Sequence, residues 1–343
     1  MDYKGKFEIF DTQKINTYPL SERNNKVKLN DLIELGNIDI AEIDVPSETR
    51  DAVEILAREI ISARKKNLPV VLFSGAHLVK NGLSKLIGDL VDRNLVTMIS
   101  GNAATSIHDF ELGLIGETSE YVPQALEKGE FGMAFEFNYL NAALIHGNKN
   151  KLGYGESVGK LILDKSFREE VEKILKLEIG TIKFKYPELC LQAKCYEKNV
   201  PFTVHAGIGT DVIDQHPYFD GRAKGGCSGR DFLIYANEIS RFTGGGVLLN
   251  VGSAVTGPEV FLKAASMAGN IGRTPKGIVT ANFDLRPYNS DHITNEKKVG
   301  YYYRDQKSIV TRVPDAYGGK GYYIGGNQKQ TIPLLYKSLV ELI

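Results

Sequence analysis

Apolar residues along this chain form short runs that alternate with stripes at helical spacing. After Ser47, Val53, Leu56, Ala57 and Ile60 recur at i, i+3, i+4 and i+7, which predicts an amphipathic helix. Largely apolar runs at 68–73, 95–99, 200–204, 247–251 and 277–283 each predict a strand buried on both faces. Strands that alternate with helices favour one doubly wound, mostly parallel α/β domain over residues 46–343.

Weaker patterns cover the rest of the chain. Residues 1–45 are polar and lack periodicity, so we expect an irregular N-terminal arm. Further helices are predicted at 187–198, 231–242 and 332–343. The glycine-rich segments 147–159 and 221–229, and the stretch before residue 326, predict loops.

The composition narrows the function classes. Forty-two basic residues balance forty-two acidic ones, so no overall field attracts nucleic acid or an anionic membrane. No apolar run reaches the roughly 18 residues that a membrane span needs, and the polar start is unlike a signal peptide. Three cysteines without a C-x-x-C pair argue against a disulfide framework or a zinc ribbon. We therefore expect a cytoplasmic protein with no nucleic-acid or membrane partner.

Small and polar residues follow four of the predicted strands. The carboxyl ends of parallel strands face one crevice, where open α/β sheets bind their ligands. The sequence therefore predicts one shared site at this edge of the sheet. There is no Walker A motif, and no G-x-G-x-x-G follows the first strand. The four segments are Ser74-Gly75-Ala76-His77, Ser100-Gly101-Asn102, 205–214 and 250–257.

A run of three glycines, Gly244, Gly245 and Gly246, stands before the strand at 247–251. Glycine permits positive φ and close approach of another group. Together with the turn at 253–257 and a helix from Pro258, the run suggests backbone N–H groups beside an anionic cofactor. A tight structural crossover would need the same residues.

Titratable residues add several candidates. His205, Asp211, Asp214 and His216 could ligate a divalent metal, but their spacing matches no standard ligand set, and no metal is predicted. Asp211 can equally hold a cationic substrate, and Asp214 can cap a helix.

Two further residues could be catalytic. His108 lies in a predicted helix, where it can act as an acid or base or simply form a structural hydrogen bond. Lys320 lies in a glycine-rich segment, where a lysine is either solvated or, if desolvated, a Schiff-base nucleophile.

The order of these segments resembles deoxyhypusine synthase and its bacterial deoxyhypusine-synthase-like relatives. The run from Gly244 to Val247 matches the family's Gly-Gly-Gly-Val directly and is the most specific feature. Asn250-Val251 stands where the family has a histidine pair, so the fold and cofactor transfer better than the substrate. The other similar segments are 72–77, 98–102 with 108–111, 200–204 with the loop to Asp211, 312–315 with Lys320, and 332–335.

The resemblance implies a Rossmann-like fold, a homotetramer with NAD at its subunit interfaces, and oxidation of a polyamine or related amine followed by alkylamine transfer. Lys320 would form the imine, and His108 is a second catalytic candidate. Asp211, Asp214 and Asn250 would bind the amine. The expected cofactor-binding residues are Ser74, Gly75, Ser100, Gly101, Asn102, Gly244, Gly245 and Gly246.

Two other functions stay open at this point. One is a nucleotide-binding relative with different or lost catalysis. The other is a metal-dependent enzyme centred on His205, Asp211 and His216.

Overall fold

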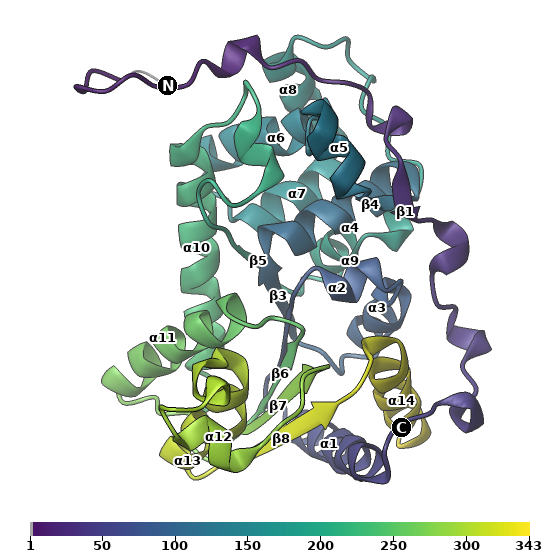
Figure 1. Ribbon diagram of the computed structural model, residues 1–343, viewed down its shortest axis with the longest axis vertical. Helices are drawn as coiled ribbons and strands as arrows, with labels where there is room; N and C mark the ends of the chain where they lie inside the picture. Colours follow the sequence, from purple (N-terminus) through teal and green to yellow (C-terminus); the bar gives the residue numbers. More distant parts are fainter. Residues whose placement is uncertain (1–2) are drawn as a thin grey trace.

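A six-stranded parallel sheet forms the centre of the computed structural model, which describes residues 3–343 (Figure 1). The strands lie in the order β5-β3-β2-β6-β7-β8. If the six strands of this sheet are renumbered 1 to 6 in chain order, their order across the sheet is 3-2-1-4-5-6. This order is typical of a doubly wound fold. The predicted fold class is confirmed. The bounds are β2 (Val70–Ser74), β3 (Met98–Asn102), β5 (Phe202–His205), β6 (Val247–Val251), β7 (Val279–Asp284) and β8 (Lys320–Gly325).

Helices cover both faces of this sheet. Strand residues alternate between the faces, so that Val70 and Leu72 pack on one side while Val71 and Phe73 pack on the other. The chain adds strands from β2 toward one edge of the sheet as far as β5, and then from β6 toward the other edge as far as β8. Because crossovers between parallel strands are right-handed, this reversal of direction places the connecting helices on opposite faces. One layer holds α1 (Ser47–Lys65), α3 (Ser84–Asp92), α9 (Leu191–Glu197) and α14 (Gln328–Glu341). The other holds α10 (Gly221–Ile239), α11 (Thr256–Asn270) and α13 (Val313–Tyr317).

The long connection from β3 to β5 builds a helical region beyond the carboxyl edge of the sheet (Figure 1). The arm runs along its surface, and β1 (Asn25–Val27) pairs antiparallel with β4 (Thr118–Glu120). The arm is therefore hydrogen-bonded to the body. The region contains α4 (Ala103–Ile115), α5 (Val122–Lys128), α6 (Phe137–Lys149), α7 (Tyr154–Leu163) and α8 (Lys165–Leu175). Two further α-helices are α2 (His77–Lys80) and α12 (Ser290–Thr294), and Gln306–Arg312 is a π-helical segment.

Two predicted loops are wrong. Residues 221–229 form the first half of α10, which begins because the Asp220 side chain accepts the N–H groups of Arg222 and Ala223. Asp231, expected to begin that helix, instead accepts the N–H groups of Val204 and Gly155. The segment that contains Lys320 is β8, which pairs with β7 along its whole length.

The predicted loop at 147–159 is also partly helical, because α7 begins at Tyr154. Conversely, the helix expected at 187–198 is broken, with a 3-10 turn at Pro187–Leu189 before α9. None of the helices in the described part of the chain is both long and apolar enough to cross a membrane.

The N-terminal end of α11 packs very closely on the sheet. A Cβ on Gly257 would lie 2.3 Å from Asn250 Oδ1 and 2.9 Å from the Phe73 ring. Only glycine lets the helix approach this far, which fixes the position of its first turn over β6.

We predict that Gly257→Ala destabilises the fold by about 2 kcal/mol, because the added methyl overpacks this contact. The matched control is Gly229→Ala in α10, where a Cβ would meet nothing within 4 Å. That change should be neutral or stabilise the protein by up to about 1 kcal/mol. Urea unfolding of both variants measures the difference. Equal stabilities would contradict the packing that we describe.

Candidate functional site

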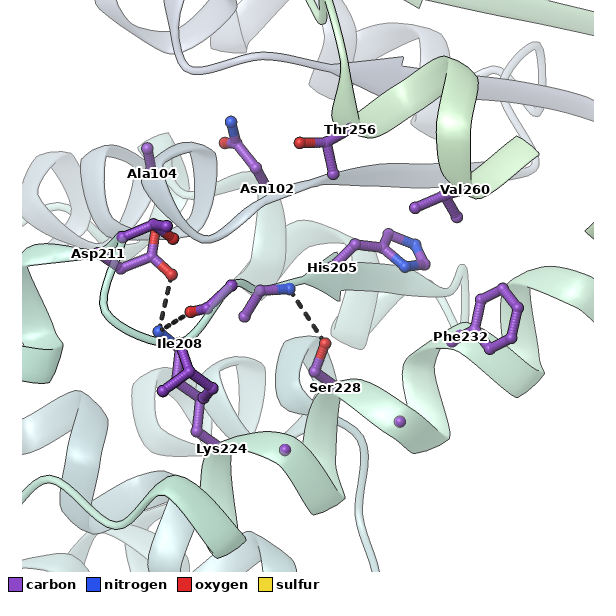
Figure 2. A pocket seen from close by; sticks show the side chains of 15 residues that line it. Asn102, Ala104, His205, Ile208, Asp211, Lys224, Ser228, Phe232, Thr256 and Val260 are labelled. Carbon is purple, nitrogen blue, oxygen red and sulfur yellow. Dashed lines mark hydrogen bonds and ion pairs between the residues drawn. The ribbon is translucent and has the colours of Figure 1, made fainter. Parts of the chain in front are cut away.

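A cleft of about 710 Å³ opens at the carboxyl ends of β3 and β5, between α10 and the first turns of α11. Figure 2 shows Thr256 and Val260 on one side of it and Lys224, Ser228 and Phe232 on the other. The cleft therefore lies at the edge of the sheet that the strand-end pattern predicted. The remaining lining residues are Asn102, Ala104, Ala206, Gly207, Ile208, Thr210, Asp211, Gly225, Gly229 and His205.

His205 ends β5 and carries its imidazole into the base of the cleft. The ring stacks on Phe73 at 5.4 Å between centroids and meets Tyr235 edge-on at 5.2 Å. Nε2 lies 3.2 Å from Thr203 Oγ1, which is 2.7 Å from Ser100 Oγ. Burial lowers the pKa of His205 to about 4. The imidazole is therefore neutral near pH 7, able to accept a proton as a weak base.

An internal ion cluster forms the opposite wall of the cleft. The Lys224 ammonium lies 2.7 Å from Asp211 Oδ2 and 2.5 Å from Asp214 Oδ1, and it donates to Gly207 O at 2.8 Å. The Lys224 side chain is 1% exposed. Burial raises the pKa of Asp211, although Lys224 opposes the shift. Asp214 Oδ2 also accepts the Gly209 N–H, so the cluster fixes the loop after β5.

Of the eight expected cofactor-binding residues, Asn102 is the one that lines the cleft. It caps α4 by accepting the Thr105 N–H. Ser74 and Ser100 are buried in the sheet, and Gly101 packs against the Thr105 side chain. Gly75 donates its N–H to Val251 O at 2.9 Å and closes the seam between the loops after β2 and β6.

The three consecutive glycines lie away from the cleft. Gly244, Gly245 and Gly246 come directly before β6 and therefore lie at its amino end, at the opposite edge of the sheet from the cleft. Gly245 has φ of 103° and Gly246 φ of 140°, and a Cβ on Gly246 would lie 2.7 Å from the Phe242 ring. The glycines make the tight crossover from α10 into β6, and the structure does not support a place for them in a cofactor site.

Lys320 is also far from the expected position. It begins β8 at the same amino edge, its side chain is 64% exposed, and Nζ lies 2.7 Å from Glu59 Oε1. The hydrogen bond to Glu59 raises the pKa of Lys320. A nucleophilic lysine needs the reverse shift and a place in the cleft. The structure supports neither requirement.

Asn250 and His108 lie outside the cleft as well. Asn250 is buried beneath α11, where its amide donates to Ser253 O and Asn282 Oδ1. It therefore supports β6 and β7 and does not reach the cleft. His108 Nδ1 lies 2.7 Å from Thr118 Oγ1 and 3.1 Å from Glu111 Oε2, on the wall of a second, smaller cavity.

The structure does not form the metal centre considered from the sequence. His216 is buried against Phe137, and its Nε2 lies 2.8 Å from Gly132 O. Asp211 is bound by Lys224. Within residues 3–343, no three His, Cys, Asp or Glu side chains are grouped closely enough to hold a metal ion.

Gly155-Glu156-Ser157-Val158-Gly159 has the spacing of a hydrolase nucleophile elbow, G-x-S-x-G. Such a serine must stand at a sharp strand-to-helix turn. Ser157 instead lies within α7, is fully buried, and donates to Gly153 O at 2.6 Å. The motif is therefore structural.

Lys224 and Phe232 are site residues that the sequence pattern missed. Both lie on α10: Lys224 in the first half, which was predicted as a loop because of its glycines, and Phe232 in the second half, which was predicted as a helix. Asp220, directly before Gly221, is a residue type that commonly caps the start of a helix, and it could have indicated that α10 begins there. Once α10 is a helix, Lys224, Ser228 and Phe232 share one face at i, i+4 and i+8.

No protein-family model matches this chain, and neither does any curated protein sequence. Solved structures with a similar arrangement include apo ArgZ, an arginine dihydrolase from the ornithine-ammonia cycle in cyanobacteria. It is 16% identical, with a TM-score of 0.49 over 87% of this chain and 33% of that one. AgrE in a ternary complex with ornithine and NAD+ is 15% identical, with a TM-score of 0.47 over 88% of this chain and 34% of that one.

A conserved putative LOR/SDH protein from Methanococcus maripaludis S2 is 14% identical, with a TM-score of 0.45 over 88% of this chain and 72% of that one. The chain spans about a third of the length of the ArgZ and AgrE chains.

The pKa of His205 predicts a specific pH dependence. The unfolded state binds the proton near the ordinary pKa of 6.5, whereas the folded state does so only near 4. The stability linked to neutral His205 is therefore present above about pH 6.5 and lost as the pH falls toward 4. The shift corresponds to about 3 kcal/mol.

His205→Phe keeps the stacking on Phe73 but removes the titrating group. Urea unfolding from about pH 7 to about pH 4 should show that the variant loses about 3 kcal/mol less stability than the wild type. Parallel losses in the two proteins would show that His205 is not held neutral.

Proposed function

We propose that this protein is an NAD-dependent enzyme that oxidises a small amine in the cleft between α10 and α11. The observation that carries the proposal is the position of the cleft, at the carboxyl edge of a sheet with the 3-2-1-4-5-6 strand order. Doubly wound sheets with this order bind dinucleotides at that edge. The resemblance to deoxyhypusine synthase supports the same cofactor.

The residues of the cleft fit a dinucleotide. Its volume, about 710 Å³, is within the usual range of cofactor sites. Gly225 and Gly229 leave one wall of α10 without side chains, and a Cβ at either would project into open space. The 15-residue helix α11 begins at Thr256 in the cleft, so its positive end can face a phosphate.

The fit differs from that of an ordinary dinucleotide-binding fold. The turn after β2 is closed, because a Cβ on Gly75 would lie 2.2 Å from Gly252 O, and α2 has only four residues. In an ordinary dinucleotide-binding fold, an acidic residue at the end of the second strand binds the ribose. Here the second strand, β3, ends in Asn102 instead. The proposed cofactor contacts therefore come from α10, α11 and Asn102.

Two groups of the cleft suit amine oxidation. Bound NAD would accept a hydride from the carbon next to the nitrogen. Asp211 can hold the substrate's ammonium, and the neutral imidazole of His205 can take up the proton that the nitrogen must lose. Phe73 and Tyr235 hold that imidazole in place.

Onward transfer of the alkylamine group is the finer part of the proposal. Lys224 is the lysine that lines the cleft, but Asp211, Asp214 and the Gly207 carbonyl hold its Nζ, so it is not free to attack an imine. A small acceptor amine attacking the imine carbon directly would avoid a lysine intermediate. The four-subunit assembly stays a prediction from the resemblance.

Calorimetric titration with NAD tests the cofactor assignment. We expect Gly229→Phe to weaken NAD binding at least about tenfold, because the ring would fill the cleft. The matched control, Leu233→Phe, changes an outward residue of the same helix that is 59% exposed, and it should bind NAD as the wild type does. A wild-type protein that shows no NAD binding at millimolar concentration would contradict the proposal.

Lys320→Ala should leave NAD binding and amine-dependent NADH formation unchanged, because the residue lies at the far edge of the sheet. NADH absorbance with a panel of diamines and amino acids measures turnover. Borohydride trapping followed by mass spectrometry locates any imine. Loss of turnover in this variant, or an adduct on Lys320, would restore the residue to the mechanism. NAD binding without NADH formation from any amine would favour a nucleotide-binding relative that lacks this catalysis.

A further inference from the structure

A second cavity, of about 230 Å³, lies between the N-terminal arm and α4. Ala104, Thr210 and Asp211 line both this cavity and the main cleft, so the two spaces share a wall. Figure 2 shows Ala104 and Asp211 at that side of the cleft. The second cavity therefore lies next to the main cleft, and Asp211 borders both.

Arg23 of the arm lines this cavity and carries one buried donor that has no partner among the described residues. Its side chain is only 4% exposed. Nη1 lies 2.7 Å from Glu111 Oε1, and Nε donates to Asn25 Oδ1 at 2.7 Å. Nη2 is buried and has no hydrogen-bond partner within residues 3–343. Leaving such a donor unsatisfied is costly, which points to an acceptor supplied by a ligand.

Lys80 is a second cation on the wall of the same cavity. Unlike Arg23, it forms no ion pair with any residue that the structure describes. Burial, with the nearby charge of Lys26, lowers the pKa of Lys80. Its ammonium would be stabilised by an anion in the cavity.

The carboxylates of the cavity are occupied by the chain itself. Burial would raise the pKa of Glu111, but Arg23 and His108 hold it well below its usual range. Glu120 accepts from the Tyr18 hydroxyl at 3.0 Å and from the Gly132 N–H at 3.0 Å. Asp211 uses Oδ2 for Lys224, and Oδ1 has no donor in the described part of the chain.

The charges are therefore arranged in two places: free donors on Arg23 and Lys80, and a free carboxylate oxygen on Asp211. A ligand with both charges would satisfy both places without adding net charge to a buried site. A polyamine would bring a cation next to Lys80, and a simple anion would face Asp211.

We propose that this cavity binds an oxyanion of the substrate, a carboxylate or a phosphate, while the substrate's ammonium reaches Asp211. The substrate is then a small zwitterion, and Arg23 makes the arm part of the binding site. The inference rests on the proposed amine-oxidising cleft for the ammonium position.

Titration of the full-length chain with a matched series tests the inference. The probes are 5-aminopentanoate, 4-aminobutyl phosphate, 1,5-diaminopentane and pentanoate, each measured without NAD and with millimolar NAD. We expect one of the two zwitterions to bind at least about tenfold more tightly than both the diamine and pentanoate. Which zwitterion binds better identifies the oxyanion as a carboxylate or a phosphate.

Lys80→Gln should weaken the zwitterion about tenfold and should not weaken the diamine, because it removes a cation that attracts one and repels the other. The residue has no partner to lose, so the fold should persist. Lys65→Gln, at the end of α1, is the control and should change neither affinity. Arg23→Lys keeps a charge beside Glu111 but removes Nη2, and it should weaken the zwitterion as well.

Three results would overturn the inference: a diamine that binds as tightly as the zwitterions, an unchanged zwitterion affinity in Lys80→Gln, or no zwitterion binding in either condition. If Lys80→Gln weakens NAD itself, the oxyanion belongs to the cofactor, and the assignment to the substrate is wrong. Failure of NAD binding alone would remove the proposed function and leave the zwitterion measurement intact.

Discussion

The buried ammonium of Lys224 is the interaction on which both cavities depend. It joins Asp211, Asp214 and the Gly207 carbonyl, and so it fixes the loop that follows β5. That loop supplies one wall of the main cleft and the wall shared with the second cavity. Removing one partner of a buried ion pair costs about 3–5 kcal/mol, because the other charge is left uncompensated. The loop is thus held in place before any ligand arrives.

The buried groups on the two sides of the main cleft have different surroundings. His205 is surrounded by aromatic rings and has no charged partner, so its imidazole stays neutral. Lys224 is also buried but has two carboxylates and the Gly207 carbonyl at hydrogen-bond distance. The cleft therefore contains a neutral imidazole and a carboxylate, the two groups that the proposed amine oxidation uses.

Much of the sheet could be predicted from the sequence, because buried parallel strands are uninterrupted apolar runs. The strand at 247–251 was predicted with the bounds of β6. The strand β8 was missed because Lys-Gly-Tyr-Tyr-Ile-Gly is half exposed at the edge of the sheet and reads as a loop. The first half of α10 was missed because glycine has a low helix propensity, which the Asp220 cap and close packing override. At Gly226 a Cβ would lie 2.3 Å from Asn148 Oδ1.

The site was only partly predictable. The strand-end pattern predicted a site at the edge of the sheet where the cleft opens, and Asn102 and Asp211 line that cleft. The glycine run and the resemblance to deoxyhypusine synthase suggested Gly244–Gly246 and Lys320, but the glycines precede β6 and Lys320 begins β8, so both lie at the other edge. Arg23 and Lys80 have no distinguishing pattern in sequence. Their importance comes from burial and unmatched hydrogen bonding, which only the folded chain creates.

Hydrogen exchange with and without NAD measures most directly where the cofactor binds. If the cleft holds NAD, protection should concentrate in the loop at 206–214 and in the first turns of α11, at 253–260. The glycine crossover at 242–246 and the start of β8 should exchange as in the free protein. Protection confined to those two amino-edge segments would contradict the central claim and return the site to the triple glycine.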